Sequence, residues 1–251
     1  MSRICWHLFS CSFVLAFIYP LRADDSGAAK EVVEKAIKAV GPEEKIAKLK
    51  ALTIKFKGKI QQMGMEIPFA GEVIAQGADQ NKVSIDIDVN GQKIAINTIL
   101  NRDKGWTKIG DMLMDMSEEQ LKEAQEGAQE SWIASLVPLK DKAYTLSSLG
   151  EVKVNDRPAL GIRVASKGHR DVNLYFDKDS SLLLKTEMRV KDEMSGQEVN
   201  QESFYSDYKE VNGLKEAMKF VIKKDGKPFL EAEVEEIRRE EKLDDSVFAK
   251  P

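Results

Sequence analysis

Four strand-like runs separated by turn signals occupy residues 172–239, and they constrain the fold more than any other feature of the sequence. In the first run, Val, Leu and Phe hold every second position from 172 to 176. Because successive side chains of a strand point to opposite faces of a sheet, this alternation predicts one apolar and one polar face. Asn-Gly at 212–213 and Asp-Gly at 225–226 favour the positive φ angles of tight hairpins. The stretch is therefore predicted to form an antiparallel meander.

The same alternation recurs nearer the N-terminus, most clearly at residues 83–89, which an Asn-Gly turn at 90–91 follows. Further strands are predicted at 52–60, 67–75, 94–98, 106–109, 112–116, 144–149, 152–154 and 161–165. Gly150 is expected to break the strand that precedes it. A single sheet of about ten or eleven strands accumulates twist and curls.

One long helix, predicted at residues 118–137, interrupts the strands. Ser117 and Gln120 have the spacing of a capping box at its start, and Pro138 stops it. Gly127 weakens the middle of this helix and indicates a bend or a close approach to the sheet. The helix is therefore the natural element to pack across a curved sheet.

Two shorter helices are predicted between residues 26 and 50, as a cap on the edge of the sheet. No repeat or low-complexity linker divides the chain. We therefore predict one α+β domain over residues 24–251. Its curved antiparallel β-sheet would form a half-barrel, with helices covering the concave face.

Residues 1–23 have the composition of a secretory signal peptide, in which an apolar stretch follows Arg3 and a small residue, Ala23, ends the segment. We predict cleavage near Ala23 and export to the periplasm or the cell envelope. Two alternatives stay open. The segment is retained as a membrane anchor, or Cys11 of the Leu-Phe-Ser-Cys sequence is lipidated.

The composition excludes several classes of function. The net charge is −4, and acidic and basic residues are interspersed without a basic stripe, which disfavours nucleic-acid binding. Cleavage near Ala23 would remove both cysteines. His169, the one histidine of residues 24–251, lies in a Lys-Gly-His-Arg turn and is expected to be solvated. Without a nucleophile elbow, a phosphate-binding glycine loop or a zinc-binding helix motif, we expect no enzyme activity, cofactor or metal.

Five methionines form two short clusters: Met63, Met65, Met112, Met114 and Met116. Their thioethers could bind Cu(I), a metal that selects soft ligands. They could instead form an adaptable apolar lining for acyl chains, or they could be ordinary packing residues. The sequence alone leaves all three interpretations open.

A cavity between the sheet and the long helix is predicted from the same alternation. Trp106 and Trp132 are interpreted either as core residues or as walls of this cavity. The residues predicted to line it are Ile85, Ile87, Ile94, Ile96, Trp106, Met112, Met114, Leu121 and Trp132.

Four segments carry a resemblance to a known family: 174–177 with 182–185, 205–213, 225–226 and 243–248. In each, a strand ends in an aspartate or glycine turn, and the last has the pattern Asp-Asp-x-x-Phe. The chain resembles the lipoprotein-carrier superfamily of the bacterial envelope, the LolA-like and LppX-like half-barrels. The resemblance implies a periplasmic protein whose sheet and helical lid enclose a hydrophobic cavity for acyl chains. It also implies a lid-holding arginine, for which the candidates are Arg102, Arg157 and Arg163.

Two functions remain after these arguments. The first is a binding protein that sequesters lipid or the acyl chains of a lipoprotein, with a lipoprotein carrier as one form of it. Its partners would be a lipid or an acylated lipoprotein, together with envelope membrane proteins. The alternative is a structural or interaction protein of the envelope, with a closed core and no ligand.

Overall fold

The computed structural model describes residues 24–62, 64–89, 91–192 and 195–251. The predicted signal peptide, with Ala23 and Cys11, lies outside the described residues. Met63 of the first methionine cluster and Asn90 of the predicted hairpin also lie outside them.

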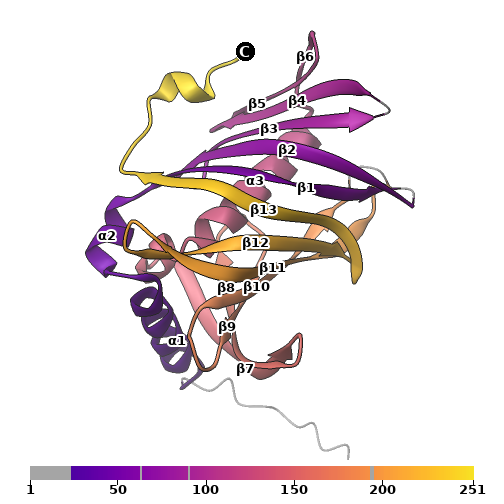
Figure 1. Ribbon diagram of the computed structural model, residues 1–251. Helices are drawn as coiled ribbons and strands as arrows, with labels where there is room; N and C mark the ends of the chain where they lie inside the picture. The colour runs from indigo at the N-terminus through magenta and orange to yellow at the C-terminus, as the bar shows by residue number, and fades with distance from the viewer. Residues whose placement is uncertain (1–23, 63, 90, 193–194) are drawn as a thin grey trace, which may run out of the picture.

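Thirteen strands form one antiparallel sheet in the described part of the chain (Figure 1). Their bounds are β1 (Ala51–Gln62), β2 (Met65–Gln76), β3 (Gln80–Val89), β4 (Gln92–Asn101), β5 (Lys104–Ile109), β6 (Met112–Asp115), β7 (Tyr144–Val154), β8 (Arg157–Ser166), β9 (Val172–Asp177), β10 (Leu183–Lys191), β11 (Glu198–Val211), β12 (Leu214–Lys224) and β13 (Lys227–Glu240). The order across the sheet is β6-β5-β4-β3-β2-β1-β13-β12-β11-β10-β9-β8-β7. Two meanders therefore meet where β1 pairs with β13.

The predicted count of about ten or eleven strands is too low. Residues 172–240 hold five strands, β9 to β13, where four runs were predicted. Gly150 does not end a strand, because β7 continues through it to Val154. The register shifts between Ser148 and Gly150, where the glycine has a φ of +79°. A β-bulge thus absorbs the glycine without ending the pairing.

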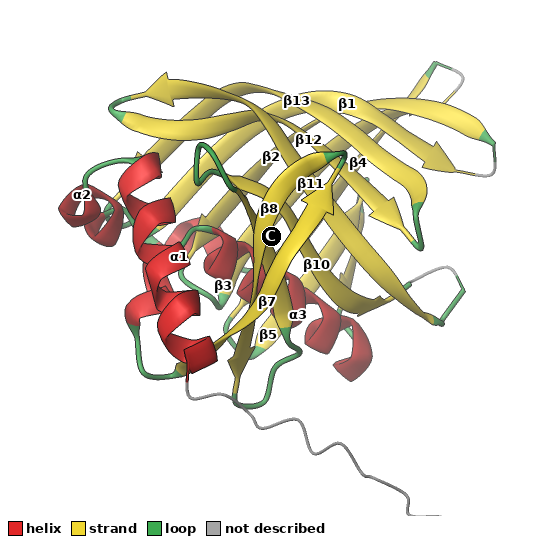
Figure 2. Ribbon diagram, turned by 90° about the horizontal axis from the view of Figure 1, so that it is seen from below, coloured by secondary structure: helices red, strands yellow, loops and turns green. Residues whose placement is uncertain are grey.

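The sheet is open, since its edge strands β6 and β7 do not pair with each other in the described residues. Figures 1 and 2 show it twisting from one edge to the other without closing. The fold is thus mostly β, with one large antiparallel sheet and three α-helices among the described residues. The predicted single antiparallel sheet with helices is confirmed. The predicted curling of that sheet into a half-barrel is not shown.

The α-helices are α1 (Asp24–Val40), α2 (Glu43–Lys48) and α3 (Glu118–Ala134). Helix α1 packs against β7, β8 and β12, and α3 crosses one face of the sheet, as Figure 2 shows. The predicted capping box is confirmed by reciprocal hydrogen bonds between Ser117 and Gln120. Helix α3 ends three residues before the predicted position. Leu136 adopts a left-handed φ of 65°, and a 3₁₀ helix, η1 (Val137–Lys140), follows.

The main hydrophobic core lies between α1, η1, the end of α3 and the β7–β10 half of the sheet. Val33 of α1, Ile133 of α3 and Phe176 of β9 are almost fully buried there. A separate cluster joins β1, β2 and β13 around Phe56 and Phe69. The space between the two clusters is where the candidate site lies.

The C-terminal segment ends in a second 3₁₀ helix, η2 (Asp245–Phe248), which packs against β3 and β4. Phe248 is fully buried beside Ile99 and Trp106. The C-terminal segment is therefore docked on the sheet through Phe248.

Candidate ligand-binding cavity

A cavity of about 440 Å³ lies between α3 and the middle of the sheet. Its walls come from α3 and from β1, β2, β3, β4, β11 and β12. Small-molecule pockets in proteins generally measure roughly 300–1,000 Å³. The volume is therefore sufficient for an organic ligand.

Strand alternation explains the apolar floor of the cavity. Leu52, Ile54 and Phe56 are every second residue of β1, and all three line the cavity. Val83 of β3 and Leu100 of β4 extend the floor by the same rule. The alternation of apolar residues in the sequence thus produces one continuous apolar surface.

The roof of the cavity is made of small residues. Ala124, Gly127, Ala128 and Ser131 of α3 lie on one helical face, at the spacing i, i+3, i+4, i+7. A Cβ atom added at Gly127 would meet nothing within 4 Å. Gly127 therefore does not mark a close approach to the sheet, because the space beside it is open. The predicted bend stays a prediction. Larger side chains on this face would fill the cavity.

Aromatic rings form one wall. Phe56 makes edge-to-face contacts with Phe69 and Phe220, with ring centroids 5.7 Å apart in each pair. A Cβ atom at Gly71 would lie 2.9 Å from the Phe56 ring. Glycine at this position therefore gives the ring the room that it needs.

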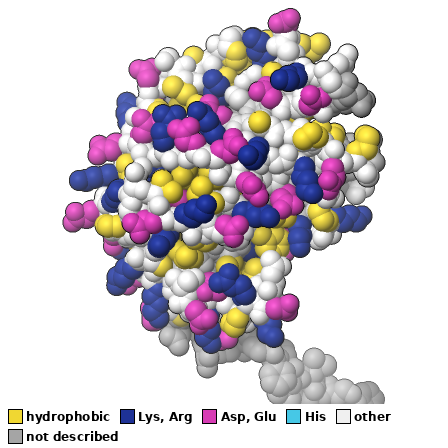
Figure 3. All heavy atoms as spheres, in the orientation of Figure 1, with side chains coloured by type: hydrophobic (Ala, Val, Ile, Leu, Met, Phe, Trp, Pro, Cys, Tyr) yellow, Lys and Arg dark blue, Asp and Glu magenta, His cyan; other side chains and the backbone are white. Residues whose placement is uncertain are grey.

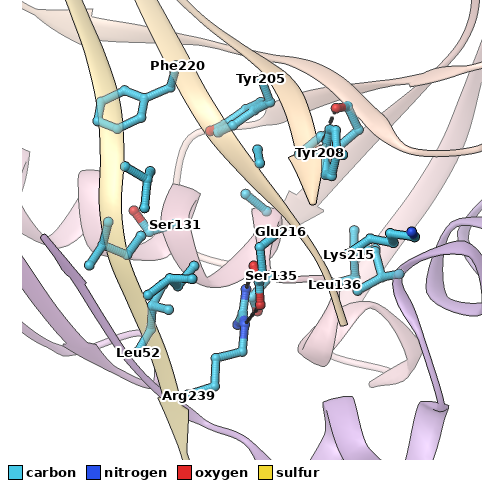
Figure 4. A pocket seen from close by; sticks show the side chains of 17 residues that line it. Leu52, Ser131, Ser135, Leu136, Tyr205, Tyr208, Lys215, Glu216, Phe220 and Arg239 are labelled. Atoms are coloured by element: carbon cyan, nitrogen blue, oxygen red, sulfur yellow. Dashed lines mark hydrogen bonds and ion pairs between the residues drawn. The ribbon is translucent and has the colours of Figure 1, made fainter. Parts of the chain in front are cut away.

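A second pocket of about 200 Å³ adjoins the cavity. The two share five lining residues, which makes them neighbouring parts of one hollow: Leu52, Ile54, Ser131, Tyr205 and Phe220. Figure 4 shows this pocket, with Phe220, Tyr205 and Tyr208 on one side and Arg239 facing Glu216 on the other. Arg239 Nη2 donates to Glu216 Oε2 at 3.0 Å. This ion pair makes the end of the hollow polar.

A polar cluster centred on Glu130 interrupts the apolar lining. Glu130 is only 8% exposed, and its Oε1 accepts a hydrogen bond of 2.5 Å from Thr186 Oγ1. Gln201 is its second hydrogen-bond partner. Burial raises the pKa of Glu130, because a low-dielectric surrounding disfavours the carboxylate. Burial also raises the pKa of the neighbouring Tyr205 hydroxyl, so the surroundings favour the neutral form of both groups.

An ion pair anchors α3 to the sheet. Both guanidinium Nη atoms of Arg170 donate to the Glu123 carboxylate, at 2.7 and 2.6 Å. This bidentate geometry is the strong form of a charge-assisted hydrogen bond. The hydrogen bonds from Arg170 lower the pKa of Glu123, with a further contribution from the backbone N–H of Lys191. The Lys191 ammonium in turn pairs with Glu119, one turn of the helix earlier.

Glu126 extends the anchor along the same side of α3. Its Oε2 accepts a hydrogen bond of 2.9 Å from the backbone N–H of Arg170. Its Oε1 lies 2.6 Å from the Lys122 ammonium and 3.4 Å from His169 Nδ1. The His169 side chain is 32% exposed and faces the helix. The expectation that this histidine is merely solvated is therefore wrong.

None of the three arginines proposed to hold the helix does so with its side chain. Arg102 pairs with Asp245, Arg157 pairs with Asp177, and Arg163 pairs with Asp171. Arg170 performs this role instead.

None of the nine residues predicted to line the cavity lines either pocket. Ile85 and Ile87 lie on the same face of β3 as Val83 and pack into the Phe56 cluster. Ile96 and Ile94 are their direct partners on β4. The four isoleucines therefore continue the apolar floor beyond the cavity.

The other five predicted residues lie elsewhere. Trp106 packs with Phe248 on the face of the sheet opposite the cavity. It pairs across β4 with Ile99, whereas Leu100, the next residue of β4, points to the cavity. Leu121 of α3 covers Gly105, and Trp132 is half-buried on the same helix. The methionines of β6 are exposed, Met112 by 63% and Met114 by 40%.

Sequence reasoning missed Phe56, Val83, Leu100, Tyr205 and Phe220 as cavity walls. The alternation in β1 and β3 identified the correct face, and this signal was available. Which part of that face lies under α3 depends on the pairing of β1 with β13 and on long-range contacts of the helix. No local pattern carries that information.

In the described residues, no group of three or more His, Cys, Asp and Glu side chains is placed to hold a metal ion. Over the same residues, no helix combines the length and the apolar character that crossing a membrane requires. Figure 3 shows acidic and basic side chains intermingled on the face in view, without a basic patch.

One large antiparallel sheet, crossed on one face by a long helix, is a fold that this chain shares with solved structures of LolA-like proteins. The resemblance predicted from the sequence is thus confirmed at the level of the fold. No family model matches the sequence, and no curated protein matches it at a significant level.

Three crystal structures illustrate the likeness. A LolA superfamily protein from Nitrosomonas europaea has a TM-score of 0.59 at 14% identity, over 88% of this chain and 97% of that one. A domain assigned to outer-membrane lipoprotein sorting from Vibrio parahaemolyticus has a TM-score of 0.57 at 12% identity, over 90% and 98%. A DUF1329 family protein from Desulfovibrio piger has a TM-score of 0.56 at 12% identity, over 88% and 97%.

Proposed function

We propose that this protein is a non-enzymatic binding protein of the bacterial cell envelope that sequesters lipid or lipoprotein acyl chains. The observation that carries the proposal is the apolar hollow between α3 and the sheet. Each methylene that an acyl chain buries there contributes roughly 0.8 kcal/mol. The fold shared with a lipoprotein-sorting domain supports this assignment.

The half-barrel form of the sheet belongs to this proposal. The main sheet contacts of α3 are with β4 and β5 on one side and with β9 and β10 on the other. The cavity lies over the strands between them, including β1, β2, β11 and β12. Helix α3 thus contacts the sheet on both sides of the cavity but leaves space above the strands in between. This arrangement supports a concave sheet face beneath the helix.

Loading would require α3 to move away from the sheet. The Arg170–Glu123 pair is the contact that holds the helix down, so it is the natural latch. The isoleucine pairs Ile85–Ile96 and Ile87–Ile94 would continue the path of the chain beyond the cavity. Whether these four isoleucines contact the ligand is not tested by the structure, and their role in binding stays a prediction.

The remaining parts of the proposal concern location and partners. Residues 1–23 would direct export to the periplasm or the cell envelope, with cleavage near Ala23. The cargo would be a lipid or an acylated lipoprotein, delivered to or from envelope membrane proteins. In the form of a lipoprotein carrier, release of cargo would follow from the opening of α3.

A blocking variant tests the proposal. The side chain of Gly127→Phe would enter the cavity, where a Cβ atom has nothing within 4 Å. Gly27→Phe on α1 is the matched control, because Gly27 is also a helical glycine with open space around it. We expect the wild type and the control to bind a fluorescent fatty-acid probe and to carry lipid in native mass spectrometry, and the blocked variant to do neither.

The alternative, a structural or interaction protein with no ligand, predicts a different result. Wild-type protein purified from an envelope fraction would then be empty, and the probe would bind none of the three proteins. That outcome would reject the proposed function.

A further inference from the structure

The lining of the 440 Å³ cavity is apolar except for a few hydrogen-bonding side chains, chiefly Asn81, Thr98, Glu130, Gln201 and Ser203. Among the described residues, no lysine, arginine or histidine lines this cavity. A carboxylate or phosphate headgroup placed in this cavity would therefore meet no cation to offset the loss of its hydration. Lys215 and Arg239 line only the adjoining pocket, where Arg239 is already paired with Glu216. The cavity is built for an apolar chain with a small polar end.

Glu130 provides one half of a headgroup site. Its carboxyl is held by Thr186 Oγ1 at 2.5 Å, and Thr186 is fully buried. Burial raises the pKa of Glu130 and so favours the protonated carboxyl, which has a proton to donate. A neutral carboxyl in a cavity wall can therefore donate a hydrogen bond to a ligand oxygen.

Asn81 provides the other half. Its Oδ1 is buried and has no hydrogen-bond partner, although Asn81 lines the same cavity. A buried carbonyl oxygen without a donor costs about 1–3 kcal/mol. The oxygen is closed to solvent, so the Asn81 amide would have to turn toward the cavity to meet a ligand O–H or N–H group, and that contact would remove the cost.

We propose that the cavity selects amphiphiles with an uncharged headgroup that both donates and accepts hydrogen bonds, a hydroxyl or an amide, and that Glu130 and Asn81 hold this headgroup. Such a group accepts from the Glu130 carboxyl and donates to Asn81 Oδ1. An anionic headgroup can do only the first of these. This inference rests on the proposed function, since it concerns the same cavity.

The test compares ligands that share a twelve-carbon chain. Dodecanol, dodecanamide, laurate and dodecylamine compete with N-phenyl-1-naphthylamine, an uncharged apolar fluorophore, for the protein at about pH 7.5. We expect dodecanol and dodecanamide to displace the probe at roughly tenfold lower concentration than laurate, because each unmatched buried polar group is costly. Equal or tighter binding of laurate or of dodecylamine would overturn the inference.

Variants locate the preference. Glu130→Leu and Asn81→Leu should each remove it while the probe itself still binds. Glu130→Gln should keep it, because the amide is also neutral and hydrogen-bonds; a gain in laurate affinity in this variant would instead show that Glu130 is anionic. Glu72→Gln, on β2 and outside the cavity lining, is the control and should behave as the wild type.

The two proposals fail in distinguishable ways. If neither the probe nor any dodecyl ligand binds, the proposed function fails, and this inference fails with it. If all four ligands bind with similar affinity, the protein binds acyl chains but the headgroup site is refuted.

Discussion

Glu130 is a buried carboxylic acid whose titration should make the stability of the protein depend on pH. Its pKa in the folded chain lies above the ordinary value of 4.5, because burial disfavours the charge. The folded state therefore holds a proton that the unfolded state has released, and stability falls as pH rises from 4.5 through the folded-state pKa. We expect Glu130→Gln to flatten this fall in urea denaturation measured at several pH values. A decline of the same size in Glu130→Gln would contradict the assignment, and Glu72→Gln serves as the control.

Gly127 gives a second prediction at the scale of the residue. Alanine lowers the backbone entropy cost of a helix interior, and its methyl group would meet nothing within 4 Å. We expect Gly127→Ala to stabilise the protein by about 0.5–1 kcal/mol in thermal or urea unfolding. A loss of stability would show that this face of α3 is closed and not open to the cavity.

The sequence predicted the faces of individual residues better than their neighbours. Alternation placed Ile85 and Ile87 correctly on the apolar floor, together with Leu52 and Phe56. It could not show that Glu130 and Asn81 share one cavity, because these residues lie on a helix and a strand that meet only in the folded chain. Trp106 was misassigned because an aromatic residue in the short strand β5, next to the edge strand β6, packs equally well on either face, and the docked Phe248 decides which.

At the scale of the element, the attachment of α3 is the feature that can be tested most directly. Arg170→Ala removes both hydrogen bonds to Glu123 and leaves the carboxylate half-buried. We expect faster probe uptake in stopped-flow fluorescence and faster amide hydrogen exchange confined to α3. Arg163→Ala is the control, since its pairing with Asp171 has a separation of 3.9 Å and involves no helix. Unchanged exchange in α3 would show that the pair is not a latch.

The same ion pair predicts an effect of acid. The hydrogen bonds from Arg170 lower the pKa of Glu123, so their stabilising contribution is complete above 4.5 and is lost as pH falls through the lower folded-state pKa. Amide exchange of α3, corrected for the intrinsic effect of pH, should therefore accelerate selectively on acidification in the wild type. In Arg170→Ala this acceleration should be smaller. Equal acceleration in both proteins would remove Glu123 from the latch.

Element boundaries show where local chemistry is sufficient. The start of α3 was predictable, because Ser117 and Gln120 satisfy the first amides of the helix by themselves. Its end was not, because the left-handed Leu136 is buried in the main core and depends on tertiary packing. The continuity of β7 through Gly150 was likewise missed, since β8 supplies the pairing that carries the strand across the bulge.

At the scale of the whole molecule, the two meanders are joined only through β1 and β13 in the sheet. Gly58 of β1 faces Ala232 of β13, and a Cβ atom there would lie 2.8 Å from Ala232 Cα and closer still to the Glu231 carbonyl oxygen. We expect Gly58→Ala to destabilise the protein by about 1–3 kcal/mol, because backbone must shift to admit the methyl group. Gly27→Ala, in open space, is the control. Similar urea midpoints for both variants would show that the contact relaxes without cost.

The two meanders could be predicted from the sequence, and so could their apolar faces. The pairing between them could not, because paired residues of β1 and β13 lie 170 to 189 positions apart in a chain of 251 and carry no matching local signal. The place of the cavity depends on this pairing, because it brings β1 and β2 beside β12 and β11 under α3. The overall shape was therefore the least predictable level of the structure.

The seam between β1 and β13 also bears on how the protein is made. Synthesis delivers β1 early, while the strand that covers its free side begins only at Lys227. For nearly the whole time of translation, the nascent chain thus presents an uncovered strand edge, which is a template for association with other chains. Aggregation would be avoided if the nascent chain stayed extended, or bound to a chaperone, until its last hairpin had left the ribosome.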